Sequence, residues 1–150
     1  MKYLLDSDMV NILYDDTRKA HHDALHRRIS KLTDEDVLQS SALVLCELEY
    51  SFYNAPDKKK ASIRKTIVSV TNDFDAILPI NQDIAPIFGE LKALFKRARN
   101  LTRKDMRSHN VDLMLASTAI QTSFILIGTD SIYQTLANLN QRLFHEYWIL

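Results

Sequence analysis

The sequence has 150 residues, and 19 lysines and arginines balance 19 aspartates and glutamates, so its formal net charge is zero. This balance argues against a protein whose whole surface binds nucleic acid, because such proteins are usually basic. With 46% hydrophobic and 25% charged residues, the chain has the composition of one globular domain over residues 1–150. Its 2 glycines and 3 prolines are too few for the tight turns of an all-β sandwich or barrel.

The cysteine content and the lack of long apolar runs both indicate a protein of the cytoplasm. Cys46 is the single cysteine and cannot form an internal disulfide, which fits a reducing environment. Residues 1–6 reach a charged side chain too early for a signal peptide, and no run approaches the roughly 20 apolar residues of a membrane span. We therefore expect a cytoplasmic protein with no membrane segment. Cys46 is expected to be buried and unreactive, because no basic group flanks it.

Short apolar runs alternate with helical patterns in the first half of the chain. Residues 3–5 predict a buried strand that ends at Asp6, and Ser7 can cap a helix over residues 7–14. Further helices are predicted from Thr17, from Ser40 or Ser41 to about residue 53, and over 58–72, with strands at 36–39 and 76–78.

The second half repeats this alternation. The clearest helix covers residues 84–98, where apolar side chains recur at steps of three and four. Residues 99–110 are polar and predict a loop. The remaining predicted elements are a helix at 111–122, an apolar strand at 124–127, a helix at 131–138 and an edge strand at 143–148. This order predicts an α/β sandwich with a central, mostly parallel sheet flanked by helices.

Four carboxylates stand at positions that favour a common site. Asp6 and Asp130 follow predicted strands, and ligands of open parallel sheets bind beyond the carboxyl ends of the strands. Asp112 lies in the first turn of its helix, with Asn110 or Ser108 as the expected cap. Glu47 stands among apolar neighbours and needs a partner. Each has a structural alternative, since Asp6 and Asp130 can also cap helices.

Carboxylates that converge repel one another, and their pKa values rise unless a cation joins them. Mg²⁺ prefers oxygen ligands, keeps several waters and suits phosphate chemistry. Such an ion can activate water and stabilise the leaving oxygen of a phosphodiester. The pattern therefore favours metal-assisted hydrolysis.

Four segments in this order resemble the PIN-domain family, and especially its VapC-type toxins: residues 4–8, 41–50, 112–117 and 125–130. The resemblance implies a three-layer PIN fold, a Mg²⁺- or Mn²⁺-dependent ribonuclease, a homodimer and a VapB-type antitoxin as partner. It gives the catalytic and metal-binding roles to Asp6, Glu47, Asp112 and Asp130, with Ser7 and Asp8 supporting them.

The sequence departs from the family pattern in places. In the first segment, Asp8 stands where family members often have Asn. In the fourth, family members often have His-Phe after the acid, whereas here Asp130 is followed by residues that end at Tyr133. Asp105 competes with Asp130 to complete the acidic set, and Glu49 competes weakly with Glu47. Because residues two apart on a helix point about 200° apart, Glu47 and Glu49 cannot both face one site.

A basic segment lies before Asp112. Residues 92–107 hold seven basic side chains and one acid, so the rest of the chain carries the balancing acidic excess. If the helix continues to residue 103, its basic side chains lie on one face and form a stripe: Lys92, Lys96, Arg99 and Arg103. Together with Arg107, this stripe predicts contact with RNA phosphates. The second cluster, residues 58–65, is interpreted as a solvated face. His22 and His26 have the i, i+4 spacing of metal ligands but lack a third ligand, which favours a surface helix.

Two rival functions remain. Residues 6–10 also fit the D-x-D-x-[TV] opening of haloacid-dehalogenase-type phosphatases, with Asp6 as nucleophile and Asp8 as general acid or base. The sequence lacks the glycine-bearing turn that usually follows there. The other rival is a non-catalytic PIN-like interaction module, against which the four intact carboxylates count.

Overall fold

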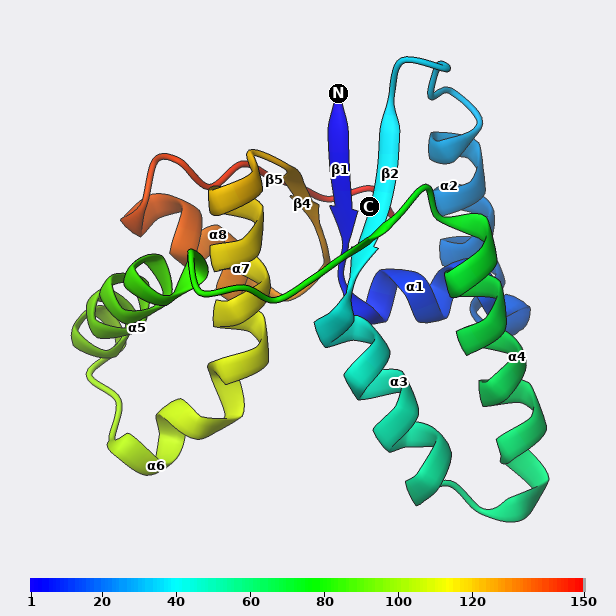
Figure 1. Ribbon diagram of the computed structural model, residues 1–150, viewed down its shortest axis with the longest axis horizontal. Coiled ribbons are helices and arrows are strands. Elements are labelled where there is room, and N and C mark those ends of the chain that lie inside the picture. Colours follow the sequence, from blue (N-terminus) through cyan, green and yellow to red (C-terminus); the bar gives the residue numbers. More distant parts are fainter. Residues whose placement is uncertain (150) are drawn as a thin grey trace.

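The computed structural model describes residues 1–149 as one five-stranded parallel sheet with helices on both faces (Figure 1). The strand order is β3-β2-β1-β4-β5, and every neighbouring pair is parallel. The strands are β1 (Lys2–Leu5), β2 (Val37–Ser41), β3 (Ile77–Leu78), β4 (Ile125–Ile127) and β5 (His145–Glu146). The predicted α/β sandwich is confirmed, with β5 at one edge of the sheet.

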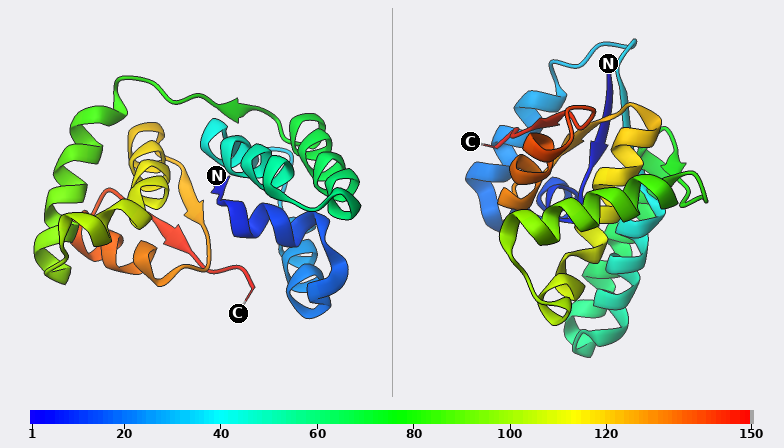
Figure 2. Two further views of the ribbon diagram at one scale, coloured as in Figure 1. Left: turned by 90° about the horizontal axis from the view of Figure 1, so that it is seen from below. Right: turned by 90° about the vertical axis from the view of Figure 1, so that its left-hand side faces the viewer.

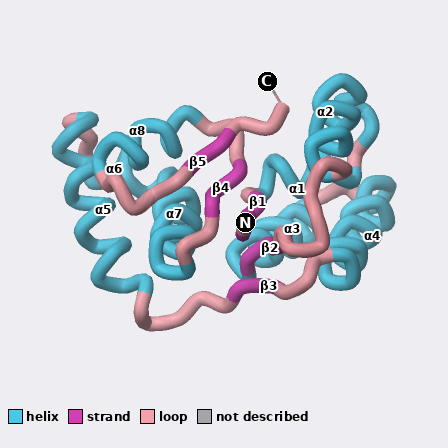
Figure 3. Tube along the Cα trace, turned by 90° about the horizontal axis from the view of Figure 1, so that it is seen from above, coloured by secondary structure: helices cyan, strands magenta, loops and turns pink. Residues whose placement is uncertain are grey.

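The helices form two groups, one on each side of the sheet (Figures 1 and 3). The first group contains α1 (Ser7–Tyr14), the 3₁₀ helix η1 (Asp16–Arg18), α2 (Lys19–Ile29), α3 (Ala42–Asn54) and α4 (Asp57–Asp73). The second contains α5 (Ile84–Arg99), α6 (Arg103–Met106), the 3₁₀ helix η2 (Arg107–His109), α7 (Asn110–Thr122) and α8 (Ser131–Leu139). The left view of Figure 2 shows the two groups from below, on opposite sides of the sheet. No helix within residues 1–149 is long and apolar enough to cross a membrane.

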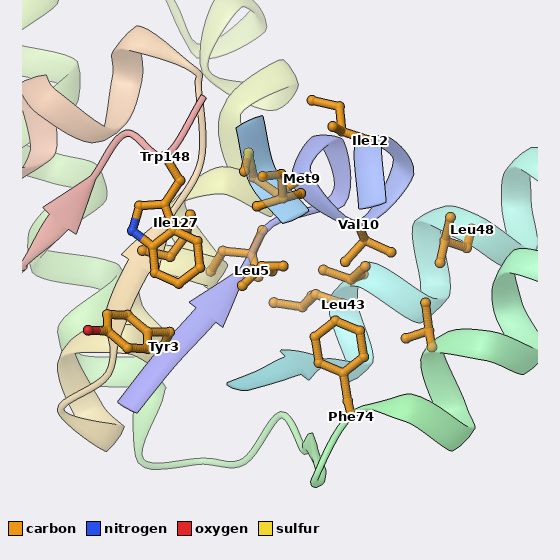
Figure 4. Packing of buried hydrophobic residues seen from close by; sticks show 14 of the residues in the cluster. Tyr3, Leu5, Met9, Val10, Ile12, Leu43, Leu48, Phe74, Ile127 and Trp148 are labelled. Carbon is orange, nitrogen blue, oxygen red and sulfur yellow. The ribbon is translucent and has the colours of Figure 1, made fainter. Parts of the chain in front are cut away.

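Strand β1 is buried on both faces, which explains its unbroken apolar run. Side chains alternate between the faces of a strand. Tyr3 and Leu5 therefore join the core under α1–α4, whereas Leu4 joins the core under α5, α7 and α8. Figure 4 shows Leu5 packed among Met9, Ile127 and neighbouring side chains of the first core. The two cores fix β1 at the centre of the molecule.

The order in which the chain adds strands to the sheet reverses between β1 and β4. From β1 the chain adds β2 and β3 on one side, and then crosses to add β4 and β5 on the other. Leu5 pairs with Ile127, and the backbone N–H of Asp6 donates to the Ile127 carbonyl at 3.0 Å. The ends of β1 and β4 therefore lie side by side at a topological switch point, where open α/β sheets bind ligands.

The prediction of a loop at residues 99–110 was wrong, because this segment contains α6 and η2. Helix α5 stops at Asn100, whose left-handed backbone (φ 49°) ends a helix in the usual way. Thr102 and Asp105 then form a capping box that starts α6. Local hydrogen bonds therefore start α6, and its sequence shows no apolar periodicity from which the helix could be predicted.

Of the two predicted caps of α3, Ser40 or Ser41, the structure has Ser41, whereas two other predicted caps were wrong. Asp6, and not Ser7, caps α1 by accepting a hydrogen bond from the Met9 N–H. Asp15 caps η1, so Thr17 lies inside that turn. Cys46 is exposed on α3, contrary to the expected burial. It follows that α3 buries a narrower face than its apolar composition indicates.

Candidate active site

A cavity of about 250 Å³ opens where β1 and β4 end. Its lining comes from four separate segments: Asp6, Ser7, Asp8, Glu47, Asp112, Leu115, Thr129, Asp130 and Tyr133. The structure thus brings together every residue that the sequence assigned to the acidic site. The side chains reach it from the end of β1 and the start of α1, from α3, from α7, and from the turn after β4 with the first turn of α8.

Asp6 lies at the buried side of this cavity, with 5% of its surface exposed. Its Oδ1 accepts a hydrogen bond from the Met9 N–H at 2.9 Å, so the structural role of a helix cap is fulfilled by the same residue. Burial raises the pKa of Asp6 to about 7. The bond from the Met9 N–H and the Tyr133 hydroxyl oppose this rise, and the charges of Asp8 and Asp112 add to it. A carboxylate held in this way is costly to ionise without a cation.

Glu47 reaches the cavity from α3, and Ser7 Oγ donates a hydrogen bond to its Oε2. Burial and the charge of Asp112 raise the pKa of Glu47. The expected apolar surroundings of Glu47 are present only in part, because Leu43 is buried whereas Cys46 and Tyr50 on the same helix are exposed. The neighbour that matters for Glu47 is the opposing carboxylate across the cavity.

Asp112 lies in the first turn of α7, which begins at Asn110 without a side-chain cap from Asn110 or Ser108. Burial raises the pKa of Asp112, and the charge of Asp130 adds to the rise. Asp130 is exposed at the rim and caps α8, with Oδ1 accepting from the Ile132 N–H at 2.9 Å. Because a helix follows each of β1 and β4, Asp6 and Asp130 each cap a helix and also line the cavity.

Asp8 is held by two neighbours on its two oxygens. Arg18 Nη1 donates to Oδ1 at 2.9 Å, and Thr129 Oγ1 donates to Oδ2 at 2.9 Å. These bonds tie α1 to η1 and to the turn after β4. Both oxygens of Asp8 are therefore engaged, and the residue offers no free carboxylate to the cavity.

The two competing acids lie elsewhere. Asp105 is used in the capping box of α6, where it accepts from Thr102 Oγ1 at 2.7 Å. Glu49 accepts two hydrogen bonds from Arg64, at 2.8 and 3.0 Å. Neither side chain lines the cavity.

Tyr133 is a member of the site that the sequence did not single out. Its side chain is fully buried in the first turn of α8, and its hydroxyl donates to Asp112 Oδ1 at 3.1 Å. Its apolar neighbours Ile132 and Leu136 make it look like a core residue in the sequence. Only the crossing of α8 and α7 aims its hydroxyl at a carboxylate.

The donor set fits a hard cation held partly through water. The acidic side chains all offer oxygen atoms, and the charge of Asp112 adds to the raised pKa values of Asp6 and Glu47. Within residues 1–149, no three side chains of the His, Cys, Asp or Glu type come close enough to form a metal site by themselves. Mg²⁺ needs only one or two direct carboxylates and keeps several waters. The cavity therefore fits a hydrated ion.

The predicted basic stripe is interrupted. Lys92, Lys96 and Arg99 share α5, but Arg103 and Arg107 lie beyond its end, on α6 and η2. Arg99 donates to Thr135 at 2.6 Å and lines a second cavity of about 210 Å³. His109 and Asp130 line this second cavity too, and Asp130 also lines the first. Arg99 is therefore the stripe residue that the structure ties to the acidic site.

Two other patterns stay outside the site. His26 Nε2 lies 3.1 Å from the Leu13 carbonyl oxygen, and its ring lies against that of His22 on α2. Lys58 and Lys59 are exposed at the start of α4. Neither cluster lines the acidic cavity.

The family model for the PIN domain matches residues 3–139 of this sequence. The chain belongs to the PIN-domain family. The family is one of nucleases, and the four acidic segments that resembled it in the sequence all fall within the matched range. PIN membership also displaces the haloacid-dehalogenase reading of residues 6–10, whose proposed acid or base, Asp8, is bound to Arg18.

Solved structures share the PIN fold over nearly the whole chain. A chain of VapBC2 from Rickettsia felis, bound to a DNA fragment from the promoter, has a TM-score of 0.77 at 21% identity and covers 99% of each chain. VapBC-1 from nontypeable Haemophilus influenzae gives 0.73 at 20% identity and 100% of each chain. FitAcB from Neisseria gonorrhoeae gives 0.69 at 18% identity and 95% of each. A comparison with curated proteins finds no match.

Proposed function

We propose that this chain is a metal-dependent ribonuclease of the VapC type, which hydrolyses RNA phosphodiester bonds with Mg²⁺ or Mn²⁺. One observation carries the proposal: carboxylates from four separate segments of a PIN fold line one cavity at the switch point between β1 and β4. Helix capping accounts for Asp6 and Asp130 but not for Glu47 and Asp112, and the mutual repulsion of these acids has a cost that a cation would remove.

Asp6, Glu47 and Asp112 would hold the ion, directly or through water, with Asp130 at the rim completing its surroundings. When bound, the ion supplies the positive charge that activates water and stabilises the departing 3′ oxygen. The chain's own contribution is orientation. Asp6 is fixed by its bond to the Met9 N–H, and Glu47 is fixed by the Ser7 hydroxyl.

RNA would approach along the side of the cavity where α5 and η2 end. Arg99 and His109 line the second cavity beside Asp130, and Lys96 is exposed one turn earlier on α5. Lys92 is partly engaged, because its Nζ donates to Asn110 Oδ1 at 2.9 Å. Arg103 and Arg107 are exposed beyond α5 and extend the basic surface. Phosphate contacts of this kind make binding strongly salt-dependent.

We further propose that the chain acts as the toxin of a cytoplasmic toxin–antitoxin pair, with a VapB-type antitoxin as partner and a homodimer as its own assembly. Support comes from the neighbouring structures, three of which carry the VapBC name in their descriptions. Co-purification with the product of an adjacent small gene, followed by measurement of the mass of the complex, tests the partner and the assembly together.

The decisive experiment uses purified protein and a mixed RNA substrate with Mg²⁺, with Mn²⁺ or with EDTA. We expect cleavage with either ion and none with EDTA. Asp6→Asn and Asp112→Asn should abolish cleavage in folded protein, whereas Asp105→Asn should retain it, since Asp105 lies in the capping box of α6. Unchanged Mg²⁺-dependent cleavage by Asp6→Asn would overturn the proposal. A wild-type protein that binds neither ion would instead favour the non-catalytic interaction module.

A further inference from the structure

The Asp112 carboxylate has one hydrogen-bond donor within the described chain, and that donor is a tyrosine. Tyr133 Oη donates to Asp112 Oδ1 at 3.1 Å. The Tyr133 side chain has no exposed surface, although its hydroxyl end lines the acidic cavity. A buried donor this close to a carboxylate strongly restricts the orientations that the carboxylate can take.

The Tyr133 ring cannot easily move away from this position. Its edge lies against Gly128, where a Cβ would stand 2.5 Å from Tyr133 Cε2. Its face is tilted against the His145 ring, with 5.4 Å between the ring centroids. His145 is itself fixed, since its Nε2 lies 3.0 Å from the Gly128 carbonyl oxygen. The hydroxyl is therefore held at a defined place beside Asp112 by packing on two sides.

The same packing places Tyr133 next to a second carboxylate. The Cβ position that comes within 2.5 Å of Tyr133 Cε2 also comes within 2.5 Å of Asp6 Oδ2. Tyr133 thus stands between Asp6, which follows β1, and Asp112, on α7. A phenylalanine would fill the same space but would donate no hydrogen bond.

We propose that Tyr133 is a positioning residue for the metal ion: its hydroxyl donates to Oδ1 of Asp112 and so fixes the orientation of the carboxylate that would hold the cation. This inference rests on the proposed function and adds a residue to its machinery. Groups that hydrogen-bond to metal-binding carboxylates fix their orientation, and losing such a group typically weakens metal affinity by about 10- to 100-fold. Tyr133 acts through Asp112 and takes no part in the bond cleavage itself.

Tyr133→Phe tests the inference, because it removes the hydroxyl and keeps the ring. The matched control is Tyr14→Phe, which also removes a tyrosine-to-aspartate hydrogen bond (Tyr14 Oη to Asp73 Oδ2, 3.0 Å) but does so away from the acidic cavity. Mn²⁺ affinity is measured by electron paramagnetic resonance titration at pH 8 without RNA. We expect Tyr133→Phe to bind Mn²⁺ about tenfold more weakly or worse, and Tyr14→Phe to match the wild type. A smaller loss in folded Tyr133→Phe overturns the inference.

The dependence of cleavage on Mn²⁺ concentration separates positioning from chemistry. Tyr133→Phe should need a higher Mn²⁺ concentration for half-maximal cleavage and should recover the wild-type rate at saturation. A lower maximal rate with unchanged Mn²⁺ affinity would show that Tyr133 acts in the reaction, and would contradict the assignment. If wild-type protein binds no Mn²⁺, the proposed function fails. If wild-type and Tyr133→Phe bind it equally, only this inference fails.

A measurement on wild-type protein keeps the inference testable if the variant does not fold. Tyrosines labelled with ¹³C at Cζ report on the bonding of their hydroxyls by NMR. Adding Mg²⁺ should shift the signal of the buried Tyr133, because the carboxylate that accepts its proton then shares its charge with the ion. The signal of Tyr14 should stay in place. No Mg²⁺-induced change at Tyr133, under conditions where Mg²⁺ binds, would overturn the inference.

Discussion

The Asp6 carboxylate lies where a side chain on Gly128 would otherwise stand. A Cβ on Gly128 would stand 2.5 Å from Asp6 Oδ2 and 2.5 Å from the ring of Tyr133. The backbone of Gly128 does not need a left-handed conformation, so the requirement for glycine is one of room alone. The turn after β4 can approach the end of β1 only because this side chain is absent.

Gly128→Ala should therefore damage both stability and metal binding. We expect a loss of about 1–3 kcal/mol in the free energy of unfolding, since an added methyl group must displace a buried carboxylate or a buried ring. Urea denaturation and Mn²⁺ titration measure the two effects. The matched control is Gly89→Ala in α5, where a Cβ meets nothing within 4 Å. That variant should gain about 0.5–1 kcal/mol from helix propensity. Equal effects of the two substitutions would contradict the close approach at Gly128.

Asp6→Asn should change the pH dependence of stability. Burial first, then neighbouring charges, raises the pKa of Asp6 from 3.8 to about 7 in the folded protein. Between these values the folded state binds a proton that the unfolded state does not, so this contribution to stability is present below pH 4 and is lost as the pH rises through 7. Asparagine carries no such charge and can still cap α1.

The asparagine variant should thus gain stability relative to wild type between pH 4 and pH 8, by up to about 4 kcal/mol for a shift of this size. Urea denaturation in EDTA at the two pH values measures the difference. A constant difference between the two proteins would show that Asp6 is not desolvated in the native state.

Glu47→Gln and Glu49→Gln should separate two carboxylates on one helix. Glu47 faces the acidic cavity, whereas Glu49 is paired with Arg64 on the other side of α3. We expect Glu47→Gln to weaken Mn²⁺ binding by about tenfold or more, as the loss of a ligand or its support does. Glu49→Gln should keep Mn²⁺ affinity and lose slightly in Tm, because an exposed ion pair contributes little. Isothermal titration and thermal unfolding measure both, and the opposite pattern would move the site to Glu49.

Neutralising the basic end of α5 should weaken RNA binding. Arg99→Gln removes a charge from the cavity that Asp130 also lines, and Lys96→Gln removes an exposed charge three residues earlier on α5. Each should reduce the slope of log affinity against log salt by roughly one, as the loss of one phosphate contact does. Fluorescence anisotropy with a labelled RNA in EDTA, across a series of salt concentrations, measures this slope. Lys58→Gln is the control for a solvated charge, and a slope that falls equally with Lys58→Gln would show that the RNA contact is nonspecific.

The fold class could be predicted because strands that are buried on both faces of a parallel sheet have unbroken apolar sequences. The apolar run at residues 3–5 and the fully apolar run at 124–127 mark the central strands, and steps of three and four mark α5. Apolar periodicity could not locate α6, which is built by the hydrogen bonds of Thr102 and Asp105. Nor could it show that α3 leaves Cys46 in solvent, since only packing decides which apolar residues are covered.

The acidic positions could be predicted from the sequence, because Asp6 directly follows one buried strand and Asp130 follows another after two residues. Ligands of open parallel sheets bind beyond such strand ends. The meeting of these two acids was decided by the tertiary structure, which places β4 beside β1 although more than a hundred residues separate them. The crossing of α7 and α8 likewise aims Tyr133 at Asp112, whereas the local helix end at Asn100 divides the basic stripe after Arg99. Residue type sets what a side chain can bind, whereas the strand order and the helix crossings set which side chains act together.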